Sequence, residues 1–288
     1  MQKRIALITW SGLPEGAASE RLLLPYLAAA HVEVQFVDWR SAGCDFSRFD
    51  LLILRSCWDS HLYGPQFVEW LQRTGVIVPI VNDVETVLWN RNKFYLRELE
   101  EKGIEIAPTI FVASGEAVGV KDRARIETWR KVVVKPAVSA SAHNTWLEDS
   151  TEFPTQAELT NRMQGEAFLV QQFIPEIQTQ GEISFTLIDG AYSHAVRKRP
   201  AAGDFRVQEE HGGSSELFVP SSSLLGKVGE IARAVPQVRK SLYCRIDVVE
   251  RAGRVLLMEL ELIEPELYLN LAEGAAGRLA KAIINRIP

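Results

Sequence analysis

The chain has 288 residues, of which 47% are hydrophobic and 24% are charged, the composition of an ordinary soluble globular protein that can build more than one core. Its formal net charge of −5 argues against nucleic-acid binding, because phosphate binding needs a dominant basic surface. No apolar run is long enough to span a bilayer and no signal sequence opens the chain, so we expect no membrane partner.

The cysteines indicate the compartment. Cys44, Cys57 and Cys244 are odd in number and widely scattered, which fits neither a disulfide framework nor a zinc site. We therefore expect three reduced thiols and a cytoplasmic protein.

The first third of the chain alternates short apolar runs with helical patterns. We expect strands over residues 4–10, 32–37, 51–54 and 76–81, and helices over about 17–30 and 64–74. Short, continuously apolar strands are typical of a buried parallel sheet. This order predicts an open α/β domain over residues 1–88.

Ligands of such domains usually lie in loops that follow the strands. Arg55, Trp58 and Asp59 follow the third predicted strand, so we treat them as candidates for substrate contact. An Arg–Asp pair that caps a loop beside a packed tryptophan fits the same residues equally well.

Beyond residue 89, strands and helices continue without repeats. We expect helices within 113–129 and over about 157–164, 222–235 and 271–286, and strands over 108–112, 131–136, 167–174, 181–188 and 192–196. Asp189-Gly190 between the last two strands is a strong hairpin signal.

Three acidic residues lie on a second predicted hairpin near the C-terminus. Asp247 lies in its first strand, and Glu259 and Glu261 project from the same side of its second strand. Buried like charges repel unless a cation neutralises them, and carboxylate oxygens suit Mg²⁺. A polar hairpin face turned to water remains an equal alternative, and Arg245 could pair with one of the acids.

Basic residues in two other places suit bound phosphates. Lys135 ends an apolar strand just before a loop of serines and alanines, although a lysine at a strand end more often simply reaches water. Residues 197–206 hold four cations in an otherwise acidic protein. Arginine favours bidentate contacts with phosphate or carboxylate, whereas a solvated loop is the alternative.

Taken together, these motifs resemble the ATP-grasp superfamily, in its glutathione-synthetase-like or RimK-like branch, over about residues 86–288. The resemblance implies an α/β (α+β) fold in which an ATP-grasp domain, residues 89–288, follows the N-terminal α/β domain. Its small lobe would cover about 113–170 and its large lobe about 171–288.

The resemblance also implies roles for individual residues. The residues that match nucleotide-binding positions are Lys93, Lys135, Ser139, Ser141, Gln171, Gln172, Phe173, Ile174 and Glu182. Lys198 and Arg206 match the catalytic cations over the γ-phosphate and acyl-phosphate site. Asp247, Glu259 and Glu261 match the magnesium ligands, and Arg197 is a further substrate candidate.

Two departures from the family pattern stand out. Glu261 occupies a position that usually holds asparagine, and the phosphate-covering loop at 139–145 lacks the expected glycines. Within the superfamily, the chain is most similar to the bacterial subfamily that includes the cycloserine-forming cyclo-ligase. The motifs that carry this likeness are Arg55-Ser-Cys-Trp-Asp59, Trp89-Asn90, Lys135-Pro-Ala-Val-Ser139, Gly181-Glu-Ile-Ser184, residues 193–200 and Glu261-Leu-Ile-Glu-Pro-Glu266.

The resemblance implies a ligase that uses ATP and Mg²⁺ on a small-molecule substrate. The γ-phosphoryl group of ATP would move to a substrate carboxylate, and a nitrogen nucleophile would then displace phosphate to form an amide or close a ring. A small-molecule kinase and a non-catalytic ATP-binding regulator are the alternatives. Relatives suggest a homodimer.

Overall fold

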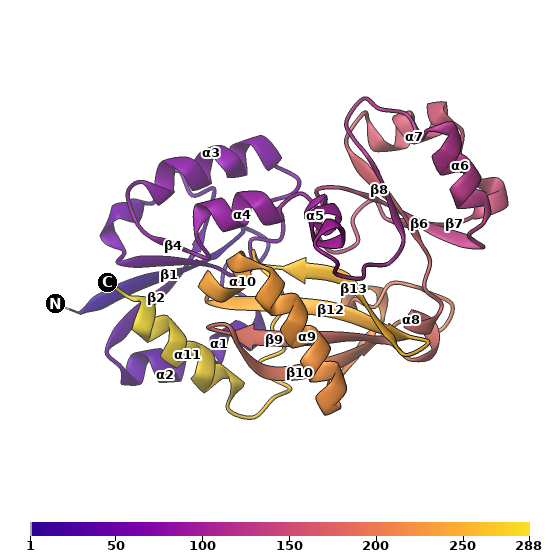
Figure 1. The fold of residues 1–288 in the computed structure, drawn as a ribbon. Helices are drawn as coiled ribbons and strands as arrows, with labels where there is room; N and C mark the ends of the chain where they lie inside the picture. Colours follow the sequence, from indigo (N-terminus) through magenta and orange to yellow (C-terminus); the bar gives the residue numbers. More distant parts are fainter. Residues whose placement is uncertain (1) are drawn as a thin grey trace.

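The computed structural model describes residues 2–288 as three sheets with helices packed around them (Figure 1). The four-stranded parallel sheet nearest the N-terminus has the order β2-β1-β3-β4. Its strands are β1 (Lys3–Thr9), β2 (Val32–Asp38), β3 (Leu51–Leu54) and β4 (Ile80–Val81).

Helices cover both faces of this parallel sheet. Alternate residues of β1 separate the two cores, since Ile5 and Leu7 face one side and Ala6 and Ile8 the other. On the first side lie α1 (Ala18–Arg21), α2 (Leu24–Ala29) and the C-terminal helix α11 (Ala275–Arg286), and on the second lies α3 (Gly64–Gly75). The last helix of the chain thus completes the core of its first sheet.

The central sheet is antiparallel and has the order β11-β10-β9-β12-β13. Its strands are β9 (Glu182–Ile188), β10 (Ala191–Arg199), β11 (Ser214–Phe218), β12 (Tyr243–Arg251) and β13 (Arg254–Glu261). On one face its apolar residues pack against α9 (Ser222–Ala234) and α10 (Pro236–Lys240). The opposite face carries polar residues and forms a wall of the site described below.

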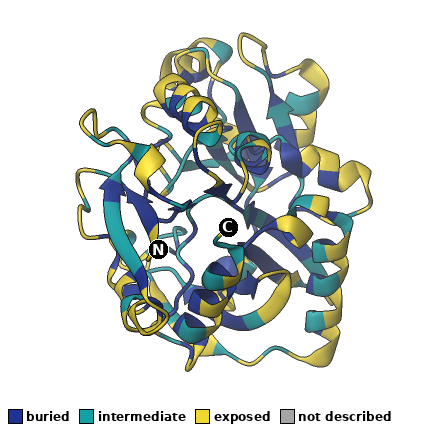
Figure 2. Ribbon diagram, turned by 90° about the vertical axis from the view of Figure 1, so that its left-hand side faces the viewer, coloured by how far each residue is buried: buried dark blue, intermediate teal, exposed yellow. Residues whose placement is uncertain are grey.

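A third sheet, also antiparallel, forms a separate lobe in the order β5-β8-β6-β7 (Figure 1). It consists of β5 (Thr109–Val112), β6 (Lys131–Pro136), β7 (Trp146–Asp149) and β8 (Phe168–Gln172), with α6 (Val120–Glu127) and α7 (Gln156–Met163) packed on it. Figure 2 shows that strands are buried in all three units while the outer helix faces are exposed. The short helices α4 (Val84–Asn90), α5 (Tyr95–Glu101) and α8 (Glu176–Thr179) connect the units.

The structure corrects several expected elements. The expected strand over 76–81 is reduced to β4, since Val76 and Ile77 are exposed beyond the end of α3 and Pro79 has no amide to donate. The expected helix over 17–30 is two short helices. Strands β7 and β11 were not expected, and β5 belongs to the sheet of the third lobe.

The division of the chain at residue 88 stays a proposal, as do the lobe boundaries. In the structure the sheet of the small lobe spans residues 109–172, and α11 packs on the N-terminal sheet. No helix among residues 2–288 is both long and apolar enough to cross a membrane.

Backbone and amide hydrogen bonds fix the units to strand β13 and its neighbours. The side chain of Asn82 donates to the carbonyls of Tyr243 and Leu262, at 3.0 and 2.6 Å, and accepts from the Leu242 amide at 2.7 Å. Asn90 likewise bonds the backbone of β13 and the residue after it. At the root of the small lobe, residues 105–107 pair with Leu257 through two backbone bonds.

We predict that Asn82→Ala lowers the free energy of unfolding by about 3 kcal/mol, because it leaves three buried backbone groups without a partner. Urea denaturation followed by circular dichroism measures the loss. Asn161→Ala, at an exposed position on α7, is the matched control and should change stability by less than ~0.5 kcal/mol. An Asn82 variant as stable as that control would contradict the role of this amide.

Candidate active site

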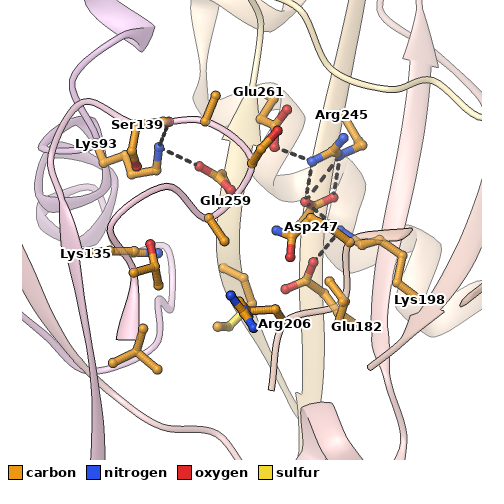
Figure 3. Close-up of a pocket in the computed structure, with 18 of the residues that line it drawn as sticks. Lys93, Lys135, Ser139, Glu182, Lys198, Arg206, Arg245, Asp247, Glu259 and Glu261 are labelled. Atoms are coloured by element: carbon orange, nitrogen blue, oxygen red, sulfur yellow. Dashed lines mark hydrogen bonds and ion pairs between the residues drawn. The ribbon is translucent and has the colours of Figure 1, made fainter. Parts of the chain in front are cut away.

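A cavity of about 480 Å³ lies between the small-lobe sheet and the polar face of the central sheet. Residues from both sheets line it, together with Trp58 and Arg91 from the N-terminal unit. Figure 3 shows acidic side chains of the central sheet on one side and Lys93 and Lys135 on the other. The cavity therefore brings together residues that are far apart in the sequence.

The three acids of the predicted hairpin meet in this cavity. Asp247 on β12 pairs with Glu259 on β13, and one oxygen from each of Asp247, Glu259 and Glu261 lies within 4.8 Å of the others. Among residues 2–288 no other group of three potential metal ligands is this close. The cluster expected from the sequence is thus present in the structure.

A bulge in β13 turns two of these acids into the cavity. The pairing register shifts between Asp247 and Val248, which face Glu259 and Leu257 respectively and leave Met258 as the extra residue. Leu257 and Leu260 consequently both lie in the apolar core. In an unbroken strand Glu259 would point to the same side as Leu257, so the bulge is what places the carboxylates opposite the core.

Asp247 is the most firmly held of the acids. It accepts hydrogen bonds from Ser184 Oγ at 2.6 Å, Lys198 Nζ at 3.0 Å and Arg245 Nε at 3.0 Å. Burial alone would raise the pKa of Asp247, but Arg245 and Lys198 hold it well below its ordinary value. Asp247 is therefore ionised across the whole working pH range.

Arg245 also contacts Glu261, so the ion pair considered as an alternative for this arginine exists beside the cluster. Burial, together with the negative charges of Glu259 and Asp247, nevertheless raises the pKa of Glu261 to about 8. The structure thus gathers more carboxylate charge at Glu261 than Arg245 offsets. An added cation would relieve this repulsion.

Glu259 and Glu182 have lysine partners. Lys93 Nζ lies 3.1 Å from Glu259 and also donates to the Ser139 carbonyl at 2.7 Å. Lys198 bridges Glu182 and Asp247. Gly181, at φ +85°, permits this bridge, because a Cβ there would lie 2.5 Å from the Lys198 carbonyl.

Lys135 is a further cation that faces the acidic cluster. Burial lowers the pKa of Lys135 while Glu259 raises it, and its one hydrogen bond, to Gln171 Oε1, is long at 3.4 Å. Four carboxylates, from Asp247, Glu259, Glu261 and Glu182, therefore face four cations, from Lys93, Lys135, Lys198 and Arg245.

The donor set fits magnesium. Asp247, Glu259 and Glu261 offer oxygen atoms only, which Mg²⁺ prefers, and the group contains no histidine or cysteine that would favour zinc. The carboxylate of Glu261, in place of the asparagine usual in the family, adds a negative charge to this set.

The other expected nucleotide-binding residues also line the cavity, namely Ser139, Ser141, Gln171, Gln172, Phe173 and Ile174. The amides of Gln172 and Phe173 are already bonded to Pro108 and Lys131. The amide of Ile174, by contrast, makes no backbone hydrogen bond within residues 2–288, so it is free to donate to a ligand.

The loop at 139–145 adopts unusual backbone conformations without glycine. Ser141, Ala142 and Asn144 have φ of 49°, 53° and 49°, in the left-handed region where non-glycine residues cost about 1 kcal/mol or more each. The missing glycines of the family loop are thus replaced by strained residues. Ser141 lines the cavity from this loop.

Some side chains of the basic loop at residues 197–206 face the cavity and others face away from it. Lys198 and Arg206 line the cavity, although Arg206 is paired with Asp204 at 2.8 Å. Arg197 points to the other face of β10, where its guanidinium lies 4.3 Å from the centre of the Phe218 ring, and it does not line the cavity. Figure 3 shows Arg206 apart from the acidic cluster.

Of the three candidates after β3, the structure brings only Trp58 to the cavity. Arg55 is buried against Glu20 and donates to the Pro265 carbonyl at 2.8 Å, and Asp59 binds Trp39 and Arg40. Arg55 and Asp59 hold loops behind the site. The alternative of an Arg–Asp pair is not observed either, because Arg55 pairs with Glu20 and Asp59 with Arg40.

The cavity residues that were not expected from the sequence include Arg91, Arg245 as a cavity cation, Glu264 and Tyr268. Glu264 lies in the motif Glu261-Leu-Ile-Glu-Pro-Glu266, and the acidic character of that motif was the available signal. Arg91 adjoins the Trp89-Asn90 motif, which gave no sign that the next side chain faces a cavity.

The phosphate-covering loop touches the N-terminal unit through two histidines. The rings of His61 and His143 lie 5.2 Å apart. Burial, together with the neighbouring His143 and Lys93, lowers the pKa of His61 to about 4, against a smaller opposing effect of the Trp58 carbonyl. The two rings therefore form a contact between this loop and the N-terminal unit in which His61 is neutral at pH 7.

Comparisons with known proteins agree with this geometry. Residues 93–265 match the ATP-grasp domain of prokaryotic glutathione synthetase, and residues 5–82 match the N-terminal domain of D-cycloserine synthetase DcsG. The cycloserine biosynthesis protein DcsG of Streptomyces lavendulae is 27% identical over 283 residues, which cover 92% of this chain and 92% of the relative. Glutathione synthetase of Prochlorococcus marinus (strain MIT 9313) is 27% identical over 239 residues, or 80% and 70% of the two chains.

Solved structures share the fold. The crystal structure of DcsG superposes with a TM-score of 0.86 at 22% identity, covering 99% of this chain and 100% of the other. D-alanine–D-alanine ligase from Bacillus anthracis complexed with ATP gives 0.66 at 17% identity, over 98% and 96% of the two chains. The ATP-grasp fold expected from the motifs, and the subfamily they indicate, are confirmed.

We predict that Glu259→Gln abolishes magnesium-dependent ADP release, by about 100-fold or more, because the amide removes one charge from the cluster. The thermal midpoint and circular dichroism spectrum should stay close to those of the unaltered protein. Glu250→Gln, an exposed acid on β12, serves as the matched control. Unaltered turnover in the Glu259 variant would remove the metal assignment.

A second prediction concerns pH. Because His61 has a pKa near 4 in the folded protein and about 6.5 when unfolded, the unfolded state binds more protons between these values. Stability should therefore fall as pH drops from 6.5 to 4, and His61→Phe should lessen that fall. Thermal midpoints at pH 7 and pH 5 measure it, with exposed His31→Asn as control. An unchanged pH response in His61→Phe would refute the assignment.

Proposed function

The chain belongs to the prokaryotic glutathione synthetase family of ATP-grasp ligases, and on that basis we propose that it activates a small, amino-acid-like carboxylate with ATP and Mg²⁺ for attack by a nitrogen nucleophile. ATP-dependent joining of carboxylate and amine is the reaction class of this family. One observation carries the assignment to this cavity: three clustered carboxylates face lysines from both lobes, the charge pattern that a metal–nucleotide complex needs.

In the proposed reaction a carboxylate oxygen of the substrate attacks the γ-phosphorus of ATP, and the bond to the β-phosphate oxygen breaks to release ADP. The nitrogen nucleophile then attacks the acyl carbon, and phosphate leaves. Lys135 and Lys198 would hold the phosphoryl oxygens, and Arg206 would join them after leaving Asp204. Bound to Asp247, Glu259 and Glu261, magnesium would supply charge neutralisation on the phosphates.

The nucleotide would occupy the end of the cavity near β8. The backbone of Gln171, Gln172, Phe173 and Ile174 would meet the adenine, and Glu182 would bind the ribose hydroxyls. Lys93 and the loop with Ser139 and Ser141 would cover the phosphates.

We further propose that the nucleophile belongs to the same molecule, so that the product is a ring. The likeness to the cycloserine biosynthesis protein extends over 92% of this chain, including its N-terminal domain, whereas the match to the glutathione synthetase family model covers residues 93–265. A homodimer stays a prediction. A kinase, the main rival, would transfer the phosphoryl group to a hydroxyl and need no amine.

We predict that ADP release depends on an added amino acid, and that hydroxylamine converts the intermediate to a hydroxamate. The measurement couples ADP release to a colour assay for hydroxamate, in the presence of ATP, Mg²⁺ and a panel of amino acids. Glu259→Gln is the matched negative control. A stable phosphorylated product without hydroxamate would contradict the ligase and support the kinase.

A further inference from the structure

One end of the cavity is not used by the nucleotide, the metal or the catalytic cations as proposed above. It is formed where the N-terminal unit meets the segment after β13, and its lining includes Trp58, Arg91 and Glu264. Glu264 follows the metal-ligand candidate Glu261 by three residues, which places it at most about 10 Å further along the chain. A substrate whose carboxylate is activated at the metal would extend into this end.

The carboxylate of Glu264 has few hydrogen-bond partners and no ion-pair partner among residues 2–288. Its main-chain carbonyl is fixed by Trp58 Nε1 at 3.0 Å, and its side chain accepts only a long hydrogen bond, 3.3 Å, from Ser60. No lysine, arginine or histidine nitrogen within residues 2–288 lies within 4.0 Å of it. Burial raises its pKa to about 7, which shows the cost of leaving this charge unpaired.

Arg91 supplies a cation at the same end of the cavity as Glu264. It is the C-cap of α4, it is half-buried, and its one hydrogen bond, to the Gly64 carbonyl, is long at 3.4 Å. Burial lowers the pKa of Arg91, while the negative charge of Glu264 raises it. The two charges therefore interact electrostatically. They nevertheless form no ion pair among the described residues.

Buried charges in proteins are normally paired. An anion and a cation that line one cavity without touching are complementary to a ligand that carries both charges or strong dipoles between them. Trp58 holds the backbone of Glu264 and Ser60 donates to its carboxylate, so the side chain lines the cavity without an ionic partner. This favours a binding role over a merely structural one.

We propose that Glu264 binds a protonated amino group of the substrate and that Arg91 binds an oxygen-bearing group of the same molecule. This inference rests on the proposed function, and it names the substrate class: an amino acid with a free amino group close to the carboxylate that is activated. Acids that lack this amino group, or carry it acylated, fit poorly because Glu264 would stay unpaired. Glu264 and Arg91 are thus specificity-determining residues.

The test measures ADP release in the presence of ATP, Mg²⁺ and hydroxylamine. The probes are D- and L-alanine and D- and L-serine, their N-acetyl derivatives, and propionate. We expect the free amino acids of at least one hand to be preferred over the N-acetyl and propionate forms by about 100-fold in kcat/KM, because the analogues leave the partly buried charge of Glu264 unpaired. ADP release by none of the probes would count against the proposed function itself.

Substitutions then test whether Glu264 and Arg91 are the residues that recognise the amino acid. Glu264→Gln should raise KM for the amino acid by about 100-fold while leaving the Kd for ATP unchanged, and Glu264→Asp should restore part of the loss. Arg91→Gln should raise KM without restoring activity toward N-acetyl substrates. Glu273→Gln, at an exposed position, is the control. Equal activity on free and N-acetylated acids, or an unchanged KM in Glu264→Gln, would overturn this inference while leaving the ligase assignment intact.

Discussion

The structure depends on balancing charge inside one cavity. Each buried carboxylate would be costly alone, and each buried cation likewise, so neither set can exist without the other. The fold meets this constraint by drawing acids from the central sheet and cations from three places: Lys93 between the units, Lys135 on the small lobe, and Lys198 with Arg245 on the central sheet itself. The lobes are thus held to a common site by electrostatics as well as by packing.

The backbone sets the direction of these acids. Strict alternation along β13 would leave Glu259 on the side of Leu257, inside the apolar core, where its charge would find no partner. The bulge at Met258 reverses the alternation, so the same strand supplies Leu260 to the core and Glu261 to the cavity. Sequence reasoning found that Glu259 and Glu261 share a face, but it could not find the bulge, because nothing in the residue types of Leu257 or Met258 marks it.

Some elements can be predicted from the sequence, and others cannot. Apolar strands such as β3 were clear because burial on both faces leaves an uninterrupted run, whereas β7 and β11 carry half-exposed and polar residues without such a signal. The packing of α11 on the first sheet is a long-range contact that periodicity does not encode. The same holds for Arg91 and Glu264, which line one cavity only after folding, and for Arg55 and Asp59, whose partners Glu20 and Arg40 lie on other segments.

The pairing of residues 105–107 with Leu257 has a consequence for turnover. This pairing, and the amides of Asn82 and Asn90, tie the N-terminal unit and the root of the small lobe to β13. The chain crosses into and out of the four-stranded lobe just beyond, at Pro108 and after Gln172. The second crossing is also the adenine-facing segment proposed above. A rotation of the lobe about these crossings would move the segment proposed to face the adenine, which would couple nucleotide binding to the angle of the lobe.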